Sequence, residues 1–262
     1  MEIYIINLKR SPGRRVRMER EMKKVKLKYN IIEGVDGLAL TEEEIQKKID
    51  PNHQFPRQFN KGELGCYLSH YSVYKKIVDE QIPYALILED DINISPRLPD
   101  LLKLIEPQIV QGEVISFFGI FPELCYLEKE KNINQTYYFT KPAGGQMVNG
   151  GQAYIMTFNA AKNMVNNMLP MNIVLDDWRY WYNKNFISDF KLVFPHPVDV
   201  TDTYSEINEP EGGIGLKIKK TIVNYNLPIL SNLILKRRRK SRFHFNINNI
   251  FIDGQKPKIL FY

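Results

Sequence analysis

The chain has 262 residues, of which 44% are hydrophobic and 12% aromatic, and this composition excludes a disordered protein and predicts a globular one with a substantial core. Its 36 lysines and arginines outnumber its 30 aspartates and glutamates, which gives a formal net charge of +6 at pH 7. A charge of this size fits an anionic ligand, an anionic membrane surface or nucleic acid, and does not choose among them.

The N-terminus, "MEIYIINLKR", begins a strand-like pattern at once, without the basic segment and apolar core of a secretory signal. No window approaches about 18 consecutive apolar residues, so we expect no membrane-spanning helix. The two cysteines, Cys66 and Cys125, are too few for a metal or disulfide framework and fit a reduced, cytoplasmic protein.

Apolar spacing predicts strands and helices that alternate along the chain. Residues 3–8 indicate a strand, 12–27 an exposed amphipathic helix, and "YNIIEGVDG" a strand that closes on a turn at Asp36. Thr41, with Glu44 three residues later, is typical of a capping box and starts a short helix. The elements expected further along are a helix over 61–81, a strand over 84–91, a helix over 100–109, a strand over 113–121, a strand and a helix within 150–168, a helix over 173–184 and a strand over 190–198. This alternation predicts an α/β domain with a mainly parallel sheet, helices on both faces, and a ligand beyond the carboxyl ends of the strands.

The stretch "PYALILEDDINISP" runs from a buried strand straight into three acids, Glu89, Asp90 and Asp91. Adjacent carboxylates repel one another, and a cation or several hydrogen-bond donors relieve that repulsion. In extended backbone Glu89 and Asp91 project to one side and Asp90 to the other. Hard divalent ions such as Mn²⁺ and Mg²⁺ are often held by one or two carboxylates together with substrate phosphates. The alternative is a solvated turn whose acids cap the next element.

Four stretches together carry a family resemblance: "IYIINLKRSPGRR", "KGELGCYLSHYSVYKKI", "YALILEDDINIS" and "GGQAYIMTFNAAK". In their order and spacing, residues 1 to about 205 resemble glycosyltransferase family 25, bacterial enzymes of lipooligosaccharide and lipopolysaccharide core synthesis that are related to collagen galactosyltransferases. The resemblance implies a GT-A-like, Rossmann-type mixed sheet flanked by helices. It also implies a UDP-sugar donor, UDP-galactose or UDP-glucose, and inversion at the anomeric carbon.

By the same resemblance the acidic triplet is the counterpart of the family's DxD motif. Asp91 would bind Mn²⁺ or Mg²⁺ directly, and Glu89 or Asp90 would reach the ribose or a coordinated water. Asn7 and Leu8 end the first strand, where a uracil can pack and bond to backbone.

Fixed positive charge for the diphosphate would come from Arg10 and Arg14. The alternative for these arginines is a solvated helix start, which is the preferred interpretation for Arg15, Arg17 and Arg20. Asp36 matches an acidic turn position of the family and would contact the nucleoside, or else forms a local Asx-turn.

The segment "GELGCYLSH" has glycines, Gly62 and Gly65, that permit close backbone approach. Ser69 and His70 are expected to line the donor pocket or to position the acidic triplet, the alternative being a buried structural histidine. Cys66 shares a helix face with His70. We reject nucleophilic Cys–His chemistry, because the pair lacks an orienting carboxylate and inverting transfer needs no covalent intermediate.

The segment "VLDDWRYW" places two acids beside two tryptophans. Asp176 or Asp177 is the candidate general base, and Trp178 and Trp181 the candidate acceptor platform. The alternative is an N-capping pair in front of a helix with core tryptophans. His196, between two prolines, is a candidate metal ligand.

From residue 212 to 262 the composition changes to a basic, partly apolar extension, in contrast to the expected catalytic domain over 1–211. The basic run over 236–242 would hold the protein on an anionic membrane surface, at the inner face of the inner membrane, rather than bind nucleic acid. The expected function is metal-dependent transfer of a hexose from a UDP-sugar to a lipid-linked core oligosaccharide. The alternative is a nucleotide- or glycan-binding module without turnover.

Overall fold

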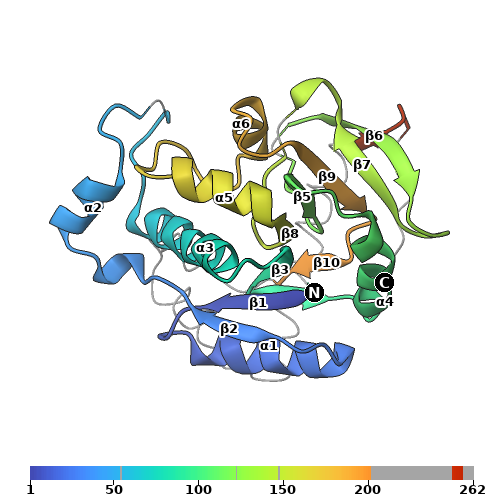
Figure 1. The fold of residues 1–262 in the computed structure, drawn as a ribbon, viewed down its shortest axis with the longest axis horizontal. Coiled ribbons are helices and arrows are strands. Elements are labelled where there is room, and N and C mark those ends of the chain that lie inside the picture. Colours follow the sequence, from blue (N-terminus) through green and yellow to red (C-terminus); the bar gives the residue numbers. More distant parts are fainter. Residues whose placement is uncertain (54, 122, 147, 202–249, 256–262) are drawn as a thin grey trace, which may run out of the picture.

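One nine-stranded mixed sheet organises the described part of the chain, which comprises residues 1–53, 55–121, 123–146, 148–201 and 250–255 of a computed structural model (Figure 1). The strands lie in the order β11-β6-β7-β9-β5-β8-β3-β1-β2. Their bounds are β1 (Glu2–Asn7), β2 (Asn30–Glu33), β3 (Tyr84–Glu89), β5 (Glu113–Ser116), β6 (Cys125–Asn132), β7 (Tyr138–Pro142), β8 (Ala153–Thr157), β9 (Asp189–Phe194) and β11 (Ile250–Ile252). Two short strands, β4 (Ile92–Ile94) and β10 (Val198–Val200), pair separately beside it.

Helices cover both faces of this sheet, α3 and α5 on one side and α1 on the other (Figure 1). The helices are α1 (Pro12–Val25), α2 (Glu42–Lys48), α3 (Lys61–Asp79), α4 (Leu98–Ile105), α5 (Phe158–Asn167) and α6 (Trp178–Asn183). Alternate residues of each central strand enter opposite cores: Tyr4 packs with α3, α5 and α6, whereas Ile5 packs with α1 and α4. Burial on both faces explains why β1 and β3 read as continuous apolar runs.

Strand direction fixes where a ligand site can form. The strands β1, β2 and β3 are parallel, and β8 runs antiparallel between β3 and β5. The carboxyl ends of β1, β2, β3 and β5 therefore meet at one edge. In the register of β1 on β3, Ile6 lies opposite Glu89, so that Asn7 is adjacent to the acids that follow β3.

The helices α2 and α3 both begin with a capping box. At α2 the box is Thr41 with Glu44, which confirms the sequence-based expectation. At α3 it is Asn60 with Glu63, which the sequence analysis did not single out. Both boxes satisfy backbone donors that a helix start otherwise leaves unpaired.

The mixed sheet flanked by helices that the resemblance implied is confirmed, but the mainly parallel sheet expected from the alternation of strands and helices is not, because four of the eight strand pairings in this sheet are antiparallel. Several elements differ as well. The predicted helix over 173–184 shrinks to α6, and the β6–β7 hairpin and the β4–β10 pair were not predicted. Within the predicted C-terminal extension, β11 pairs in parallel with β6 of the main sheet. The basic run over 236–242 lies outside the described residues. Across the described helices, none is both long and apolar enough to cross a bilayer.

Candidate active site

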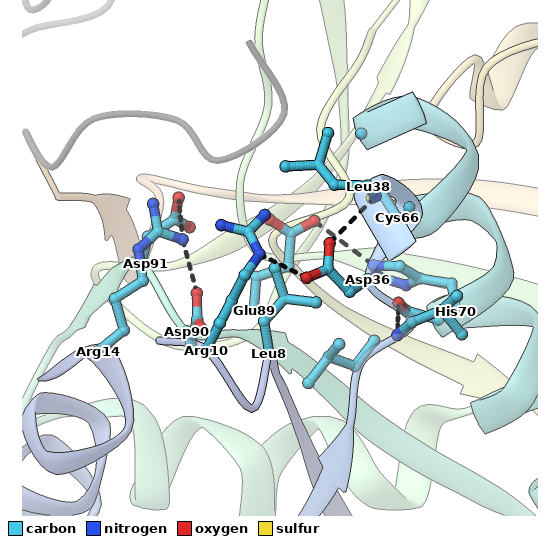
Figure 2. Close-up of a pocket in the computed structure, with 15 residues that line it drawn as sticks. Leu8, Arg10, Arg14, Asp36, Leu38, Cys66, His70, Glu89, Asp90 and Asp91 are labelled. Atoms are coloured by element: carbon cyan, nitrogen blue, oxygen red, sulfur yellow. Dashed lines mark hydrogen bonds and ion pairs between the residues drawn. The ribbon is translucent and has the colours of Figure 1, made fainter. Parts of the chain in front are cut away.

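A pocket opens beside the acidic triplet at the carboxyl end of β3 (Figure 2). Its walls come from the ends of β1 and β3, the turn after β2, and the first half of α3. Its empty volume is about 630 Å³ with the part open to solvent included. Among the residues predicted to bind the donor, those that line it are Leu8, Arg10, Arg14, Asp36, Ser69, His70, Glu89 and Asp90, and the predicted metal ligand Asp91 lines it as well.

Asp90 is held from two sides and is only 6% exposed. Asn7, the last residue of β1, donates through Nδ2 to Asp90 Oδ2 at 2.7 Å. Arg14 on α1 donates through Nη1 to Asp90 Oδ1 at 2.8 Å and lies 3.5 Å from Asp91 Oδ2. Asp90 and Asp91 therefore both face Arg14, and the expected alternation is lost because β3 ends at Glu89 and the next two residues form a turn.

Arg17 is a site residue that the sequence analysis missed. It donates through Nη1 and Nη2 to the backbone carbonyls of Ile92 and Asp90, and so anchors the turn that carries the acids. Because Arg14 and Arg17 are three residues apart on α1, they share a helix face. That spacing was visible in the sequence, but nothing in it showed which face meets β3.

Glu89 points to the opposite wall of the pocket, toward α3 (Figure 2). Its Oε1 lies 3.4 Å from Nε2 of His70, whose Nδ1 is 2.7 Å from the hydroxyl of Tyr154. The Tyr154 hydroxyl is also bonded to that of Tyr74. Burial lowers the pKa of His70 to about 3, so the ring is neutral. Burial, followed by the charges of the neighbouring Asp91 and Asp90, raises the pKa of Glu89 well above its ordinary value.

Ser69 joins α3 to the turn after β2 by hydrogen bonds. Its Oγ donates to the carbonyl of Gly65 at 2.6 Å and accepts from the backbone N–H of Val35 at 2.8 Å. Beside it, a β-carbon on Gly65 would lie 2.6 Å from the backbone nitrogen of Gly37, and only glycine permits this approach. Ser69 and Gly65 therefore fix the turn after β2 against α3.

Arg10 and Asp36 form an ion pair at the rim of the pocket, with Arg10 Nε donating to Asp36 Oδ2 at 2.8 Å. The other carboxylate oxygen of Asp36 accepts from the N–H of Leu38, which is the Asx-type cap considered from the sequence. Local capping and pocket lining thus coexist in one side chain.

The two acids of the "LDDW" segment have different roles. Asp176 is partly buried, accepts from the N–H of Gly150 at 3.0 Å, and has a pKa raised chiefly by loss of solvation. A β-carbon on Gly151 would lie 3.5 Å from Glu89 Oε1 and 3.8 Å from the Asp176 β-carbon, so this glycine separates two close acids. Asp177 instead caps α6, its Oδ1 accepting from the N–H of Tyr180.

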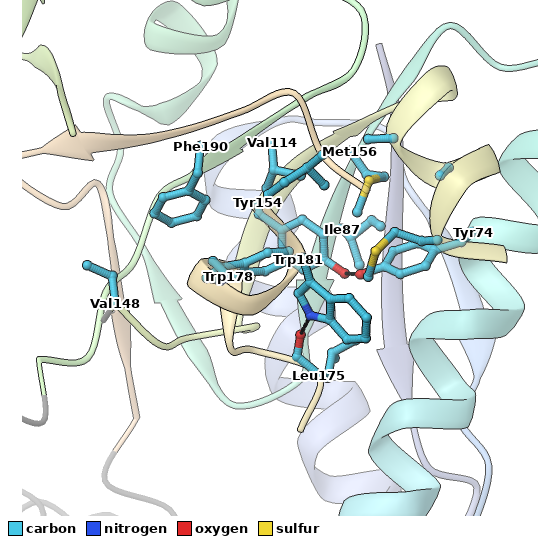
Figure 3. Close-up of a cluster of buried hydrophobic side chains, with 14 of the residues drawn as sticks. Tyr74, Ile87, Val114, Val148, Tyr154, Met156, Leu175, Trp178, Trp181 and Phe190 are labelled. Carbon is cyan, nitrogen blue, oxygen red and sulfur yellow. Dashed lines mark hydrogen bonds between the residues drawn. The ribbon is translucent and has the colours of Figure 1, made fainter. Parts of the chain in front are cut away.

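The expectation of a tryptophan platform is wrong. Trp178 and Trp181 are each 1% exposed and pack in the core (Figure 3). The indole N–H of Trp178 donates to the carbonyl of Gly150 and that of Trp181 to the carbonyl of Leu175. Trp178 stacks on Phe190 rather than facing solvent. A short helix capped by an acid, with core tryptophans, is the arrangement observed.

His196 lies among aromatic rings. It stacks on Phe121 and contacts Phe118 and Phe194, and its Nδ1 is 3.1 Å from the carbonyl of Val193. The antiparallel β4–β10 ladder, extended by the bond from Ser95 N–H to the carbonyl of residue 197, places His196 beyond the end of β4 that is remote from Asp91. We therefore do not assign His196 as a ligand.

The acidic triplet suits a hard divalent cation. Asp91 Oδ1 is buried without a hydrogen-bond partner among the described residues, and Glu89 and Asp176 add further carboxylates nearby. A buried, unpaired carboxylate oxygen is costly, and a bound cation removes that cost. Asp91 therefore fits the ligand role that the sequence suggested.

Procollagen galactosyltransferases and a further family member are similar to parts of this chain. Procollagen galactosyltransferase 2 of Homo sapiens is 28% identical over 206 residues, which cover 72% of this chain and 32% of that protein. Procollagen galactosyltransferase 1 of Danio rerio is 29% identical over 210 residues, 74% of this chain and 33% of that protein. The inactive glycosyltransferase 25 family member 3 of Homo sapiens is 32% identical over 124 residues, 44% of this chain and 21% of that protein. The chain spans about a third of the length of the two galactosyltransferases.

A solved glycosyltransferase involved in the glycosylation of the major capsid of PBCV-1 is similar with a TM-score of 0.34 and 12% identity, over 73% of this chain and 81% of that one. The family model described as glycosyltransferase family 25 (LPS biosynthesis protein) matches residues 1–178. Since this match covers well over half of the sequence, the chain belongs to glycosyltransferase family 25.

Proposed function

We propose that this chain is a metal-dependent, inverting glycosyltransferase of GT-A type that transfers a hexose from a UDP-sugar to a lipooligosaccharide or lipopolysaccharide core acceptor. One observation carries the proposal: the acids after β3 and the arginines after β1 line the same pocket. A site that pairs acids for a cation with arginines for phosphates suits a metal-bound nucleoside diphosphate.

When bound, Mn²⁺ or Mg²⁺ would stabilise the negative charge that develops on the leaving diphosphate. Asp91 would hold the ion through its unpartnered oxygen. Asn7 and Asp90 keep the Arg14 guanidinium at the pocket, where it can share the diphosphate charge with Arg10. Because these groups are fixed before the donor binds, little reorganisation is needed during transfer.

The nucleoside would occupy the part of the pocket between Leu8 and the turn after β2. Leu8 and Val35 offer apolar surface to a uracil, and Asp36 lies where a ribose hydroxyl could bond. The names of the matched relatives favour galactose as the sugar, with glucose as the second candidate.

Asp176 is the better of the two candidates for the general base. Its raised pKa favours proton uptake from an attacking hydroxyl, whereas the Asp177 carboxylate is committed to the cap of α6. We expect Asp176→Asn to lower kcat with donor binding retained. Asp177→Asn is the matched control, because asparagine also caps helices well. Equal activity in the two variants would exclude Asp176 as the base.

The acceptor would reach the site at the membrane surface. The basic run over 236–242 would attract the chain to anionic lipid on the inner face of the inner membrane, at about 1 kcal/mol for each basic residue near the surface. Sedimentation with vesicles of anionic and of zwitterionic lipid tests this membrane contact. The chain should bind the anionic vesicles more strongly, and this preference should disappear when the basic residues of the run are replaced by serines.

A second candidate function is donor binding without turnover, which the match to a family member named as inactive favours. Calorimetry with UDP-galactose and Mn²⁺, together with an assay for released UDP, separates the two functions. Wild type should bind the donor only with metal and should release UDP with acceptor present. Asp91→Asn should lose both, whereas Asp100→Asn, on the exposed surface of α4, should lose neither. Full UDP release by Asp91→Asn would overturn the proposed metal site.

A further inference from the structure

Three potential metal ligands of different chemistry meet on the α3 wall of the pocket. The Sγ atom of Cys66, the ring nitrogen of His70 and a carboxylate oxygen of Glu89 all lie within 4.8 Å of one another (Figure 2). Cys66 and His70 are four residues apart on one face of α3, the spacing by which helices commonly present two ligands to one ion. Glu89 arrives from the end of β3, so two separate elements define the group.

A second observation points to a ligand here. His70 is 1% exposed, and its Nε2 faces Glu89 yet has no hydrogen-bond partner among the described residues. Its other nitrogen is held by the Tyr154 hydroxyl, which in turn is bonded to Tyr74. This is the arrangement of a metal-binding histidine, in which an outer partner orients the ring and leaves one nitrogen for the ion.

We propose that Cys66, His70 and Glu89 form a binding site for a thiophilic divalent cation such as Zn²⁺, distinct from the Mn²⁺ or Mg²⁺ position at Asp91. Sulfur and imidazole ligands select Zn²⁺ over Mg²⁺ and Mn²⁺, which prefer oxygen. Zinc bonded to these three groups at its usual lengths sets the ligand atoms about 3.5 Å apart. A movement of the ligand atoms of Cys66, His70 and Glu89 by roughly 1 Å, through rotation of their side chains, would bring them to these separations. Three protein ligands leave a fourth position open toward the pocket.

The site is separable from the proposed transferase function, because ion binding here requires neither donor nor acceptor. Glu89 belongs to both the acidic triplet and this group, whereas Cys66 and Asp91 each belong to one. Variants of Cys66 and Asp91 therefore test the two proposals independently.

Titration of the full chain with Co²⁺, a spectroscopic substitute for Zn²⁺, tests the site. Wild type should bind one Co²⁺ with a thiolate-to-cobalt charge-transfer band in the near ultraviolet, and Zn²⁺ should displace it. Cys66→Ala should lose the band and bind at least about 100-fold more weakly, as expected for loss of a direct ligand. Cys125→Ala is the matched control, since that cysteine is buried in β6 away from the group, and it should keep the band.

Absence of the band in wild type, or its persistence in Cys66→Ala, would overturn the proposal. Persistence of the band in Cys125→Ala assigns the thiolate to Cys66 even where Cys66→Ala fails to fold. Asp91→Asn should keep the band while losing UDP and Mn²⁺ binding. If donor binding fails in every protein and the band remains, the zinc site stands and the transferase proposal does not.

Discussion

Replacing Tyr154 with phenylalanine removes one oxygen from the centre of a buried network. The hydroxyl is the shared partner of His70 Nδ1, at 2.7 Å, and of the Tyr74 hydroxyl, at 2.5 Å. Tyr154 is fully buried, as is Tyr74, so water does not replace the lost bonds. Tyr154→Phe leaves two buried polar groups without a partner.

The expected loss of stability follows from those two groups. A buried polar group left unsatisfied costs about 1–3 kcal/mol, so Tyr154→Phe should lower the free energy of unfolding by about 2–6 kcal/mol. Equilibrium denaturation in urea at pH 7 measures it, with the slope of the transition expected to be unchanged.

Tyr74→Phe is the matched control, because it removes one bond and leaves Tyr154 bonded to His70. Its cost should be near 1 kcal/mol. The two changes should also be non-additive, since both remove the bond between the hydroxyls. A Tyr154→Phe protein as stable as wild type, or strict additivity in the double variant, would refute the network.

Three further predictions concern the pocket wall, the turn that carries the acids, and the aromatic cluster. Gly65→Ala should lower the free energy of unfolding by about 1–3 kcal/mol, because its β-carbon would meet the backbone of Gly37 at 2.6 Å, and a wild-type denaturation midpoint would contradict this. Arg17→Met should weaken UDP–Mn²⁺ binding about tenfold, which corresponds to about 1.4 kcal/mol, because the turn that carries the acids is then no longer held in place. Arg20→Met, at an exposed position, should not weaken it, and calorimetry that finds equal affinities for the two variants would exclude the anchoring role of Arg17. Burial lowers the pKa of His196 to about 4, so the unfolded chain takes up the proton first as pH falls from 6.5, and about 2 kcal/mol of stability should be lost by pH 5. His196→Gln should flatten this part of the stability profile, and an unchanged slope would exclude the histidine as its cause.

The central elements were predictable because their signals are local. The apolar run of β3, its abrupt acidic end and the helical period of α3 each lie within one segment. Parallel strands place their carboxyl ends at one edge, which was enough to bring the acids and the arginines to one pocket. The short strands of β4 and β10 offered no such pattern, because three residues do not establish a period.

The remaining site residues depend on tertiary contacts that a single sequence does not reveal. Arg17 resembles its solvated neighbours on α1 until the pairing of β1 with β3 brings it to the backbone of the acidic turn. Trp178 and Trp181 have the composition of a sugar platform, but burial decides the role of an aromatic side chain, and both are in the core. Cys66 likewise acquires metal-ligand partners only when β3 brings Glu89 to α3.

The charges at the carboxyl end of β3 favour a bound cation for a reason that does not depend on the family resemblance. Glu89, Asp90 and Asp91 end a strand buried on both faces, and Arg14 is bonded to one of them and lies 3.5 Å from another. Burial and the like charges of Asp91 and Asp90 raise the pKa of Glu89, because both disfavour its ionised form. A divalent ion would reverse that balance by giving the carboxylates an opposite charge at contact distance. Ion binding should therefore release protons and raise the stability of the fold together, since both follow from the same ionisation.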